Sequence, residues 1–251
     1  RVKESFVKRR ESVRAVIVSD MLRGFLEEGY PLYCGAKARN IIPNVQKLLE
    51  QELSRDAKVF YLCDHHNPDD PEFKMFPSHC VEGTVEAELI PELSKYPGKI
   101  IPKKTYSLYF GTTLGKELGD LKPETVVVCG VCTHICVLYG VADTRIRGYA
   151  VEVPVDCVAS FDEKAHFSAL NHMEKVLGAK LTRVSSFPTP QPRFNIPDYV
   201  ITGETSDIYF VRTVEILKKE GLNPVATMEV FPSRDGILCG MEEVKALLSK
   251  V

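Results

Sequence analysis

The sequence predicts an α/β fold, a three-layer αβα arrangement around a six-stranded parallel sheet, followed by a small C-terminal α+β extension. Two observations support this prediction. Short, almost continuous apolar runs of strand length recur along the first 184 residues, and stretches with apolar residues at helical spacing lie between them. Strands that alternate with helices form a parallel sheet with helices on both faces.

The first half of the chain supplies three strands. Residues 13–19 (VRAVIVS) form a nearly continuous apolar run, which is typical of a strand buried on both faces. Residues 58–63 (KVFYLC) and 99–102 are the second and third strands. A helix between the first two is predicted because apolar residues recur at helical spacing, at Ile41, Ile42, Val45, Leu48, Leu49 and Leu53.

The second half continues the alternation. A helix over residues 112–121 leads to a fourth strand, residues 125–130 (TVVVCG). A helix from Thr133 ends at Gly148, and a fifth strand spans residues 150–155. Asp162 is suited to cap a helix that runs to Gly178, before a sixth strand at residues 180–184.

The composition changes after residue 184, so we predict a first domain over residues 1–184. Four prolines and few apolar residues mark residues 185–197 as an extended linker. Residues 198–251 then predict a helix, a short strand and a final helix. About sixty residues is marginal for an independent core, so we expect this extension to pack against another surface.

Composition excludes several classes of protein. The 251 residues are 44% hydrophobic and 26% charged, as in soluble globular domains. A net charge of −2 argues against a nucleic-acid partner, and no apolar run approaches the ~18 residues of a membrane span. Eight cysteines are too few for a disulfide scaffold, so we expect reduced thiols and a cytoplasmic protein. Residues 1–14 carry six Lys or Arg and two Glu, and we interpret them as a solvated lead-in rather than a transit peptide.

Polar residues follow four predicted strands at their carboxyl ends. They are Asp20, the segment DHH at residues 64–66, the pair Lys103 and Lys104, and the segment GVCTHIC at residues 130–136. Ligands bind outside the carboxyl ends of strands in an open parallel sheet. We therefore predict an active site where these segments converge.

Cys136 is the candidate nucleophile, because it lies in the first turn of a predicted helix, where the helix dipole lowers a thiol pKa. A buried structural cysteine is the commoner alternative, and the CxxC formed by Cys129 and Cys132 admits a redox or zinc site. As a base, His134 faces away at a two-residue spacing on a helix, so Asp20 is the better candidate. A nearby lysine would stabilise both the carboxylate and the thiolate.

A candidate metal site lies on the second strand's carboxyl end. Asp64 and His66 share a face of an extended segment, His65 points away, and His79 can return as a third ligand. One carboxylate and two imidazoles leave coordination positions open, as catalytic metal sites do. A solvated polar loop is the alternative, since Asn67, Asp69 and Asp70 follow.

Together these segments resemble the isochorismatase-like cysteine hydrolases over residues 14–184. The resemblance rests on VIVSDM at residues 16–21 with Phe25, KKTYS at 103–107 and GVCTHICV at 130–137. The DHH segment followed by FPSHCVEGT at residues 76–84 resembles the nicotinamidase branch.

The resemblance implies roles for individual residues. The family's catalytic Asp, Lys and Cys fall on Asp20, Lys103 and Cys136, and its metal ligands on Asp64, His66 and His79. Its aromatic substrate pocket falls on Phe25, Phe76 and Tyr106, and a cis peptide on Val131–Cys132, which aims the amides of Cys132 and Cys136 as an oxyanion hole. The chain departs from the family pattern where Phe76 replaces a common Trp and Cys132 a usual Ala.

The implied activity is hydrolysis of nicotinamide to nicotinate and ammonia through a cysteine thioester, in NAD salvage. One divalent ion, zinc or iron with manganese as a further option, would bind the pyridine ring. A small-molecule amide substrate and a homo-oligomer are expected, without nucleic-acid or membrane partners. Two alternatives stay open: a related hydrolase of another small amide or carbamoyl compound, and a non-catalytic nicotinate-binding module.

The extension has its own resemblance, to the amino-terminal segment of nicotinate phosphoribosyltransferases. It rests on PRF at residues 192–194, TSDIYF at 205–210 and GILCGMEEV at 236–244. The barrel of such a transferase is missing, so no transferase activity is expected. A link to a nicotinate phosphoribosyltransferase and simple packing at a subunit interface are equally good interpretations.

Overall fold

The computed structural model of the protein describes residues 13–184. The predicted lead-in before residue 13, the linker and the extension lie outside the described residues, so the domain boundaries stay predictions. No helix in the described range is long and apolar enough to span a membrane.

A parallel sheet forms the centre of the described domain, with strand order β3-β2-β1-β4-β5-β7. Its strands are β1 (Arg14–Ser19), β2 (Lys58–Asp64), β3 (Lys99–Lys103), β4 (Thr125–Val131), β5 (Ala150–Pro154) and β7 (Lys180–Thr182). A seventh, two-residue strand, β6 (Val158–Ala159), pairs only with the end of β4. The predicted α/β fold is thus confirmed, with one short strand more than the six predicted.

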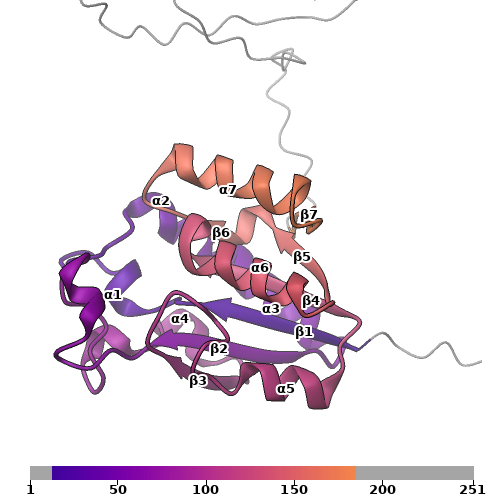
Figure 1. The fold of residues 1–251 in the computed structure, drawn as a ribbon, viewed down its shortest axis with the longest axis horizontal. Coiled ribbons are helices and arrows are strands. Elements are labelled where there is room, and N and C mark those ends of the chain that lie inside the picture. Colours follow the sequence, from indigo (N-terminus) through magenta and orange to yellow (C-terminus); the bar gives the residue numbers. More distant parts are fainter. Residues whose placement is uncertain (1–12, 185–251) are drawn as a thin grey trace, which may run out of the picture. The chain divides into compact units, whose positions relative to one another are not determined.

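Helices cover both faces of this sheet. The longer ones are α3 (Ile42–Leu53), α5 (Leu114–Leu121), α6 (Leu138–Ile146) and α7 (Glu163–Lys175). Figure 1 shows α6 and α7 on one side of the sheet and α3 behind it on the other. Strand β1 lies between these layers, and its residues from Ala15 to Val18 are at most 1% exposed. The nearly continuous apolar run of this strand follows from burial on both faces.

The strand order reverses between β1 and β4. From β1 the chain moves outward through β2 to β3, and it then returns across the sheet to pair β4 with the free side of β1. In open α/β sheets, ligands bind at such a reversal, outside the carboxyl ends of the two strands. This edge holds the end of β1 and the segment that follows β4.

Several local features differ from the predicted elements. Three four-residue helices, α1 (Arg23–Leu26), α2 (Ala36–Arg39) and α4 (Pro91–Ser94), are too short to show a helical period in the sequence. The helix predicted from residue 133 opens with a π-helical turn, Thr133–Val137, and its α-helical part ends at Ile146. As predicted, Asp162 caps α7, by accepting a hydrogen bond from the amide of Ala165.

Candidate active site

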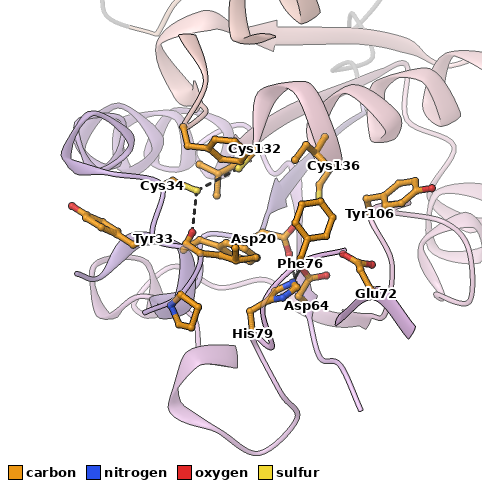
Figure 2. A pocket seen from close by; sticks show the side chains of 16 residues that line it. Asp20, Tyr33, Cys34, Asp64, Glu72, Phe76, His79, Tyr106, Cys132 and Cys136 are labelled. Carbon is orange, nitrogen blue, oxygen red and sulfur yellow. Dashed lines mark hydrogen bonds and ion pairs between the residues drawn. The ribbon is translucent and has the colours of Figure 1, made fainter. Parts of the chain in front are cut away.

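The predicted polar residues meet at the carboxyl edge of the sheet. Asp20 follows β1, and Asp64 and Lys103 are the paired last residues of β2 and β3. Cys136 lies in the π-helical turn after β4. Figure 2 shows Asp20, Asp64, His79 and Cys136 around one cavity.

Gly130 is what allows the two central strands to end so close together. Its φ is +110°, and a Cβ built on it would lie 2.0 Å from the carbonyl oxygen of Ser19 on β1. Any side chain would collide with that backbone atom, and the left-handed φ itself disfavours one. The glycine therefore fixes the approach of the segment that carries Cys136 to the segment that carries Asp20.

A buried lysine joins the other charged groups. Lys103 Nζ lies 2.9 Å from Asp20 Oδ2, 2.5 Å from Asp64 Oδ1 and 3.6 Å from Cys136 Sγ. Burial opposes its charge, but Asp20, Asp64 and Cys136 outweigh burial and raise the pKa of Lys103 well above its usual value. The adjacent Lys104 is exposed and donates to Asn67 instead. Lys103 is therefore the cation that faces the thiol.

Asp20 is held by three donors and is almost fully buried. Its Oδ1 accepts from the backbone N–H of Asp64 at 3.0 Å, and its Oδ2 accepts from Ser19 Oγ, also at 3.0 Å, and from Lys103. Burial and the Asp64 carboxylate raise the pKa of Asp20 to about 6, against the opposing effect of Lys103. A base with a pKa near the working pH is well matched to proton transfer.

The pKa of the Cys136 thiol is shifted upward, whereas the helix dipole predicted a downward shift. Burial raises it well above its usual value; Lys103 lowers it, and Asp20 and Asp64 raise it further. The prediction was wrong because a sequence does not reveal that the thiol is buried beside two carboxylates. The resting group is the neutral thiol beside Asp20, so it would need a base to act as a nucleophile.

Asp64, His66 and His79 form a set of donors suited to a metal ion. Their ligand atoms all lie within 4.8 Å of one another, with Asp64 Oδ2 3.6 Å from His66 Nε2 and 3.9 Å from His79 Nε2. Within the described residues, His66 Nε2 is the one buried side-chain nitrogen or oxygen without a hydrogen-bond partner. An unpartnered buried nitrogen that faces a carboxylate and a second imidazole fits a metal site.

The second ring nitrogen, Nδ1, of both imidazoles also has a polar partner, as in metal sites. His66 Nδ1 lies 3.1 Å from Asp70 Oδ2, and His79 Nδ1 lies 2.8 Å from the carbonyl oxygen of Pro77. Such outer partners orient the rings and leave Nε2 for an ion. His65 turns away, with Nε2 3.4 Å from the carbonyl of Ala87. Asp64 therefore joins the lysine through one oxygen and this donor set through the other.

The two histidines have different pKa values without a metal ion. Burial lowers the pKa of both, and for His79 this effect prevails. For His66, the Asp64 and Asp70 carboxylates outweigh burial and raise the pKa to about 9. Lys103 and His66 in turn overcome the burial of Asp64 and lower its pKa to about 2. A divalent ion would replace the His66 proton as the partner of Asp64.

The cavity beside these groups has a volume of about 290 Å³ and largely apolar walls. Phe25, Phe76 and Tyr106, the predicted aromatic residues, all line it. His134 does not line it; its Nδ1 is 2.6 Å from Ser160 Oγ, so it is not poised as the base. The peptide between Val131 and Cys132 is cis, as the resemblance implied.

Sequence reasoning missed part of this cavity wall. Glu72, Phe161 and the loop residues from Pro31 to Cys34 also line it. Burial and Asp64 raise the pKa of Glu72. The loop has no periodic pattern of apolar residues that would identify it as part of a cavity wall. Phe161 was missed because it is one of several aromatic residues flanked by polar residues in the sequence. The one sequence feature that could have indicated this part of the wall is Cys34, because cysteine is a reactive residue type and Gly35 follows it directly.

Comparison with known proteins gives one family and a consistent set of structures. The isochorismatase domain family matches residues 14–185. The crystal structure of a nicotinamidase from Bacillus subtilis is 29% identical, with a TM-score of 0.64, over 68% of this chain and 99% of that one. A pyrazinamidase of Pyrococcus horikoshii in complex with zinc is 29% identical, with a TM-score of 0.63, over 68% and 98%. An N-carbamoylsarcosine amidase from Thermoplasma acidophilum is 28% identical, with a TM-score of 0.63, over 70% and 99%.

Proposed function

This chain belongs to the isochorismatase family, and from that premise we propose that it hydrolyses nicotinamide to nicotinate and ammonia through a thioester on Cys136. It is an amide-hydrolysing enzyme, as are the family members that it resembles in structure. The observation that carries the proposal is the contact of one buried lysine with a carboxylate and a thiol, directly beside a buried donor set for a metal ion.

We assign the proton transfers to Asp20. It takes the proton of the Cys136 thiol as sulfur attacks the carboxamide carbon, and it gives that proton to the departing ammonia. A water molecule, deprotonated by the same carboxylate, then hydrolyses the thioester and restores the thiol. Lys103 stays protonated and balances the negative charge that passes between Asp20 and the sulfur. The amides of Cys132 and Cys136 would donate to the oxyanion.

Asp64, His66 and His79 would hold a divalent ion, and their two nitrogens and one oxygen suit a borderline metal such as zinc or iron. When bound, such an ion supplies an open coordination position for a ring nitrogen. The zinc complex of the pyrazinamidase favours zinc among the candidate metals. Phe25, Phe76 and Tyr106 would hold the faces of the ring.

The donor set also decides between substrates. The similarity to an N-carbamoylsarcosine amidase keeps a small carbamoyl compound as the second candidate. Such a substrate has no aromatic nitrogen to bind a metal ion, and it would leave the orphaned His66 Nε2 and its neighbours without a role. The donors and the aromatic walls together favour a nitrogen-containing ring. A role in NAD salvage, with nicotinate passed on to a phosphoribosyl transfer, stays a prediction.

The test is ammonia release by the full chain from nicotinamide, pyrazinamide, benzamide and N-carbamoylsarcosine. We expect turnover of the first two, at least tenfold less from benzamide, which lacks the ring nitrogen, and loss of activity on chelation that zinc restores. Cys136→Ala is the inactive control. Faster hydrolysis of N-carbamoylsarcosine than of nicotinamide, unaffected by the chelator, would show that the substrate assignment is wrong.

A further inference from the structure

Two cysteines whose sulfur atoms have no part in the proposed chemistry lie in contact in the cavity wall. The Sγ atoms of Cys34 and Cys132 are 3.3 Å apart, although the residues are 98 positions apart in the sequence. Cys34 comes from the loop before α2, and Cys132 follows β4. Figure 2 shows their sulfurs joined by a dashed line above Asp20, on the same cavity as Cys136.

This pair is distinct from the CxxC seen in the sequence. Cys129 is fully buried within β4 and does not line the cavity, and neither do Cys63, Cys80 and Cys157. Among the described residues, only Cys34, Cys132 and Cys136 offer a thiol to the cavity, and all seven described cysteines are free. A small oxidant that enters the cavity therefore meets two sulfurs already in contact.

We propose that Cys34 and Cys132 form a reversible disulfide that switches the enzyme off under oxidising conditions, with a hydroperoxide as the oxidant. The sulfur of Cys34 attacks one peroxide oxygen, which gives a sulfenic acid and, from hydrogen peroxide, one water. The sulfur of Cys132 then attacks the Cys34 sulfur, the S–S bond forms, and a second water leaves. The two thiols lose two electrons and two protons in total, and the peroxide is reduced to two waters.

The protonation state of Cys136 protects the proposed nucleophile from the oxidant. Burial raises the pKa of Cys136 well above the usual value, and a hydrogen bond with Cys34 together with burial does the same for Cys132. Both therefore rest as neutral thiols, which react slowly with peroxides. The contact between Cys34 and Cys132 is what carries the proposal. We write Cys34 as the first sulfur oxidised and Cys132 as the resolving thiol, and the opposite order gives the same disulfide.

The disulfide would disturb the site because of where Cys132 lies. A disulfide requires an S–S distance of about 2.05 Å, so the two sulfurs must approach by more than 1 Å. Cys132 is the first residue after β4 and caps the turn that carries Cys136. A displacement of about 1 Å at a catalytic group can cost ~100-fold in rate. This consequence, unlike the disulfide itself, rests on the proposed thioester chemistry at Cys136.

The first experiment detects the disulfide directly and does not depend on an activity assay. Cys136→Ala is treated with a small excess of hydrogen peroxide, alkylated, digested and mapped by mass spectrometry. We expect a Cys34–Cys132 cross-linked peptide that dithiothreitol removes. Cys34→Ala in the same background should lose it, whereas Cys157→Ala, a buried cysteine off the cavity, should keep it. No cross-link, or one that survives in the Cys34→Ala background, would overturn the proposal.

The second experiment follows amide hydrolysis by the unmodified chain. Peroxide should lower its activity 10- to 100-fold in step with the cross-link, and dithiothreitol should restore it. The activity of Cys34→Ala after peroxide treatment is compared with the activity of the same variant before treatment. The fold loss should be at least fivefold smaller than that of the unmodified chain. A cross-linked enzyme with full activity would refute the switch, and so would a wild-type cross-link between Cys132 and Cys136. If no amide is hydrolysed but the cross-link forms, the proposed function fails and the disulfide stands.

Discussion

At the scale of single residues, burial sets the chemistry of the proposed nucleophile and base. Cys136 would be a poor thiolate in this environment, and Asp20 is a better base than an ordinary carboxylate. The pKa values of both groups are raised for the same reason: each group is buried at the edge of the sheet, close to the Asp64 carboxylate. Lys103 contacts all three groups, so its charge offsets the two carboxylates at rest and would offset a thiolate at Cys136.

The first prediction concerns pH. With zinc saturating, kcat/KM should fall as the pH drops through about 6, because a protonated Asp20 cannot accept the thiol proton. Ser19→Ala removes a hydrogen bond to the charged carboxylate, which should raise the Asp20 pKa and move this acid limb to higher pH. Ser160→Ala, which removes a hydroxyl bonded to His134, should leave the limb in place. An acid limb that Ser19→Ala does not move would point to another group as the base.

The second prediction concerns the metal donors. His66→Ala and His79→Ala should each lower the bound zinc and raise KM for nicotinamide more than they lower kcat. The reason is that the ion would orient the ring, while Asp20 and Cys136 would carry out the proposed proton transfer and nucleophilic attack. His65→Ala is the matched control: it is the adjacent imidazole that faces Ala87, and it should keep full metal content. Full zinc occupancy in both His66→Ala and His79→Ala would eliminate the site.

At the scale of elements, the end of β4 decides whether the site can form. Gly130→Ala should destabilise the protein by about 3 kcal/mol or more, from a positive φ and a collision with the Ser19 carbonyl. Gly111→Ala is the matched control, since Gly111 also has a positive φ (+69°) but open space around it. It should cost only ~1 kcal/mol. The urea midpoints of the two variants measure the difference, and equal midpoints would show that the close approach is unimportant.

Elements also explain how much could be predicted from the sequence. The strand ends and their polar residues were predictable because a parallel sheet gathers the carboxyl ends of its strands at one edge. Only the family resemblance selected Lys103 over Lys104. The alternation of buried and exposed side chains along β3 would also select Lys103, but it can be applied only once the last residue of the strand is known. The π-helical turn, the short helices and the loop that holds Cys34 were not predictable, because tertiary contacts fix them.

At the scale of the whole molecule, the described domain contains every group that the proposed chemistry uses. The family match also ends at residue 185. A chain shortened to residues 1–185 should therefore retain amide hydrolysis and metal binding within about threefold of the full chain. Activity assays and metal analysis on the two chains measure this. A folded, zinc-binding shortened chain without activity would mean that residues 186–251 complete the active site.

The most direct test of the central claim is to trap the thioester. The full chain, quenched in acid during nicotinamide turnover, is digested and analysed by mass spectrometry. The account predicts one nicotinoyl group on the peptide that contains Cys136, its loss on treatment with hydroxylamine, and its absence in Cys136→Ala. Cys132→Ala should still form it, because that residue contributes its backbone amide rather than its sulfur. A nicotinoyl group on Cys132, or steady turnover by Cys136→Ala, would contradict the account.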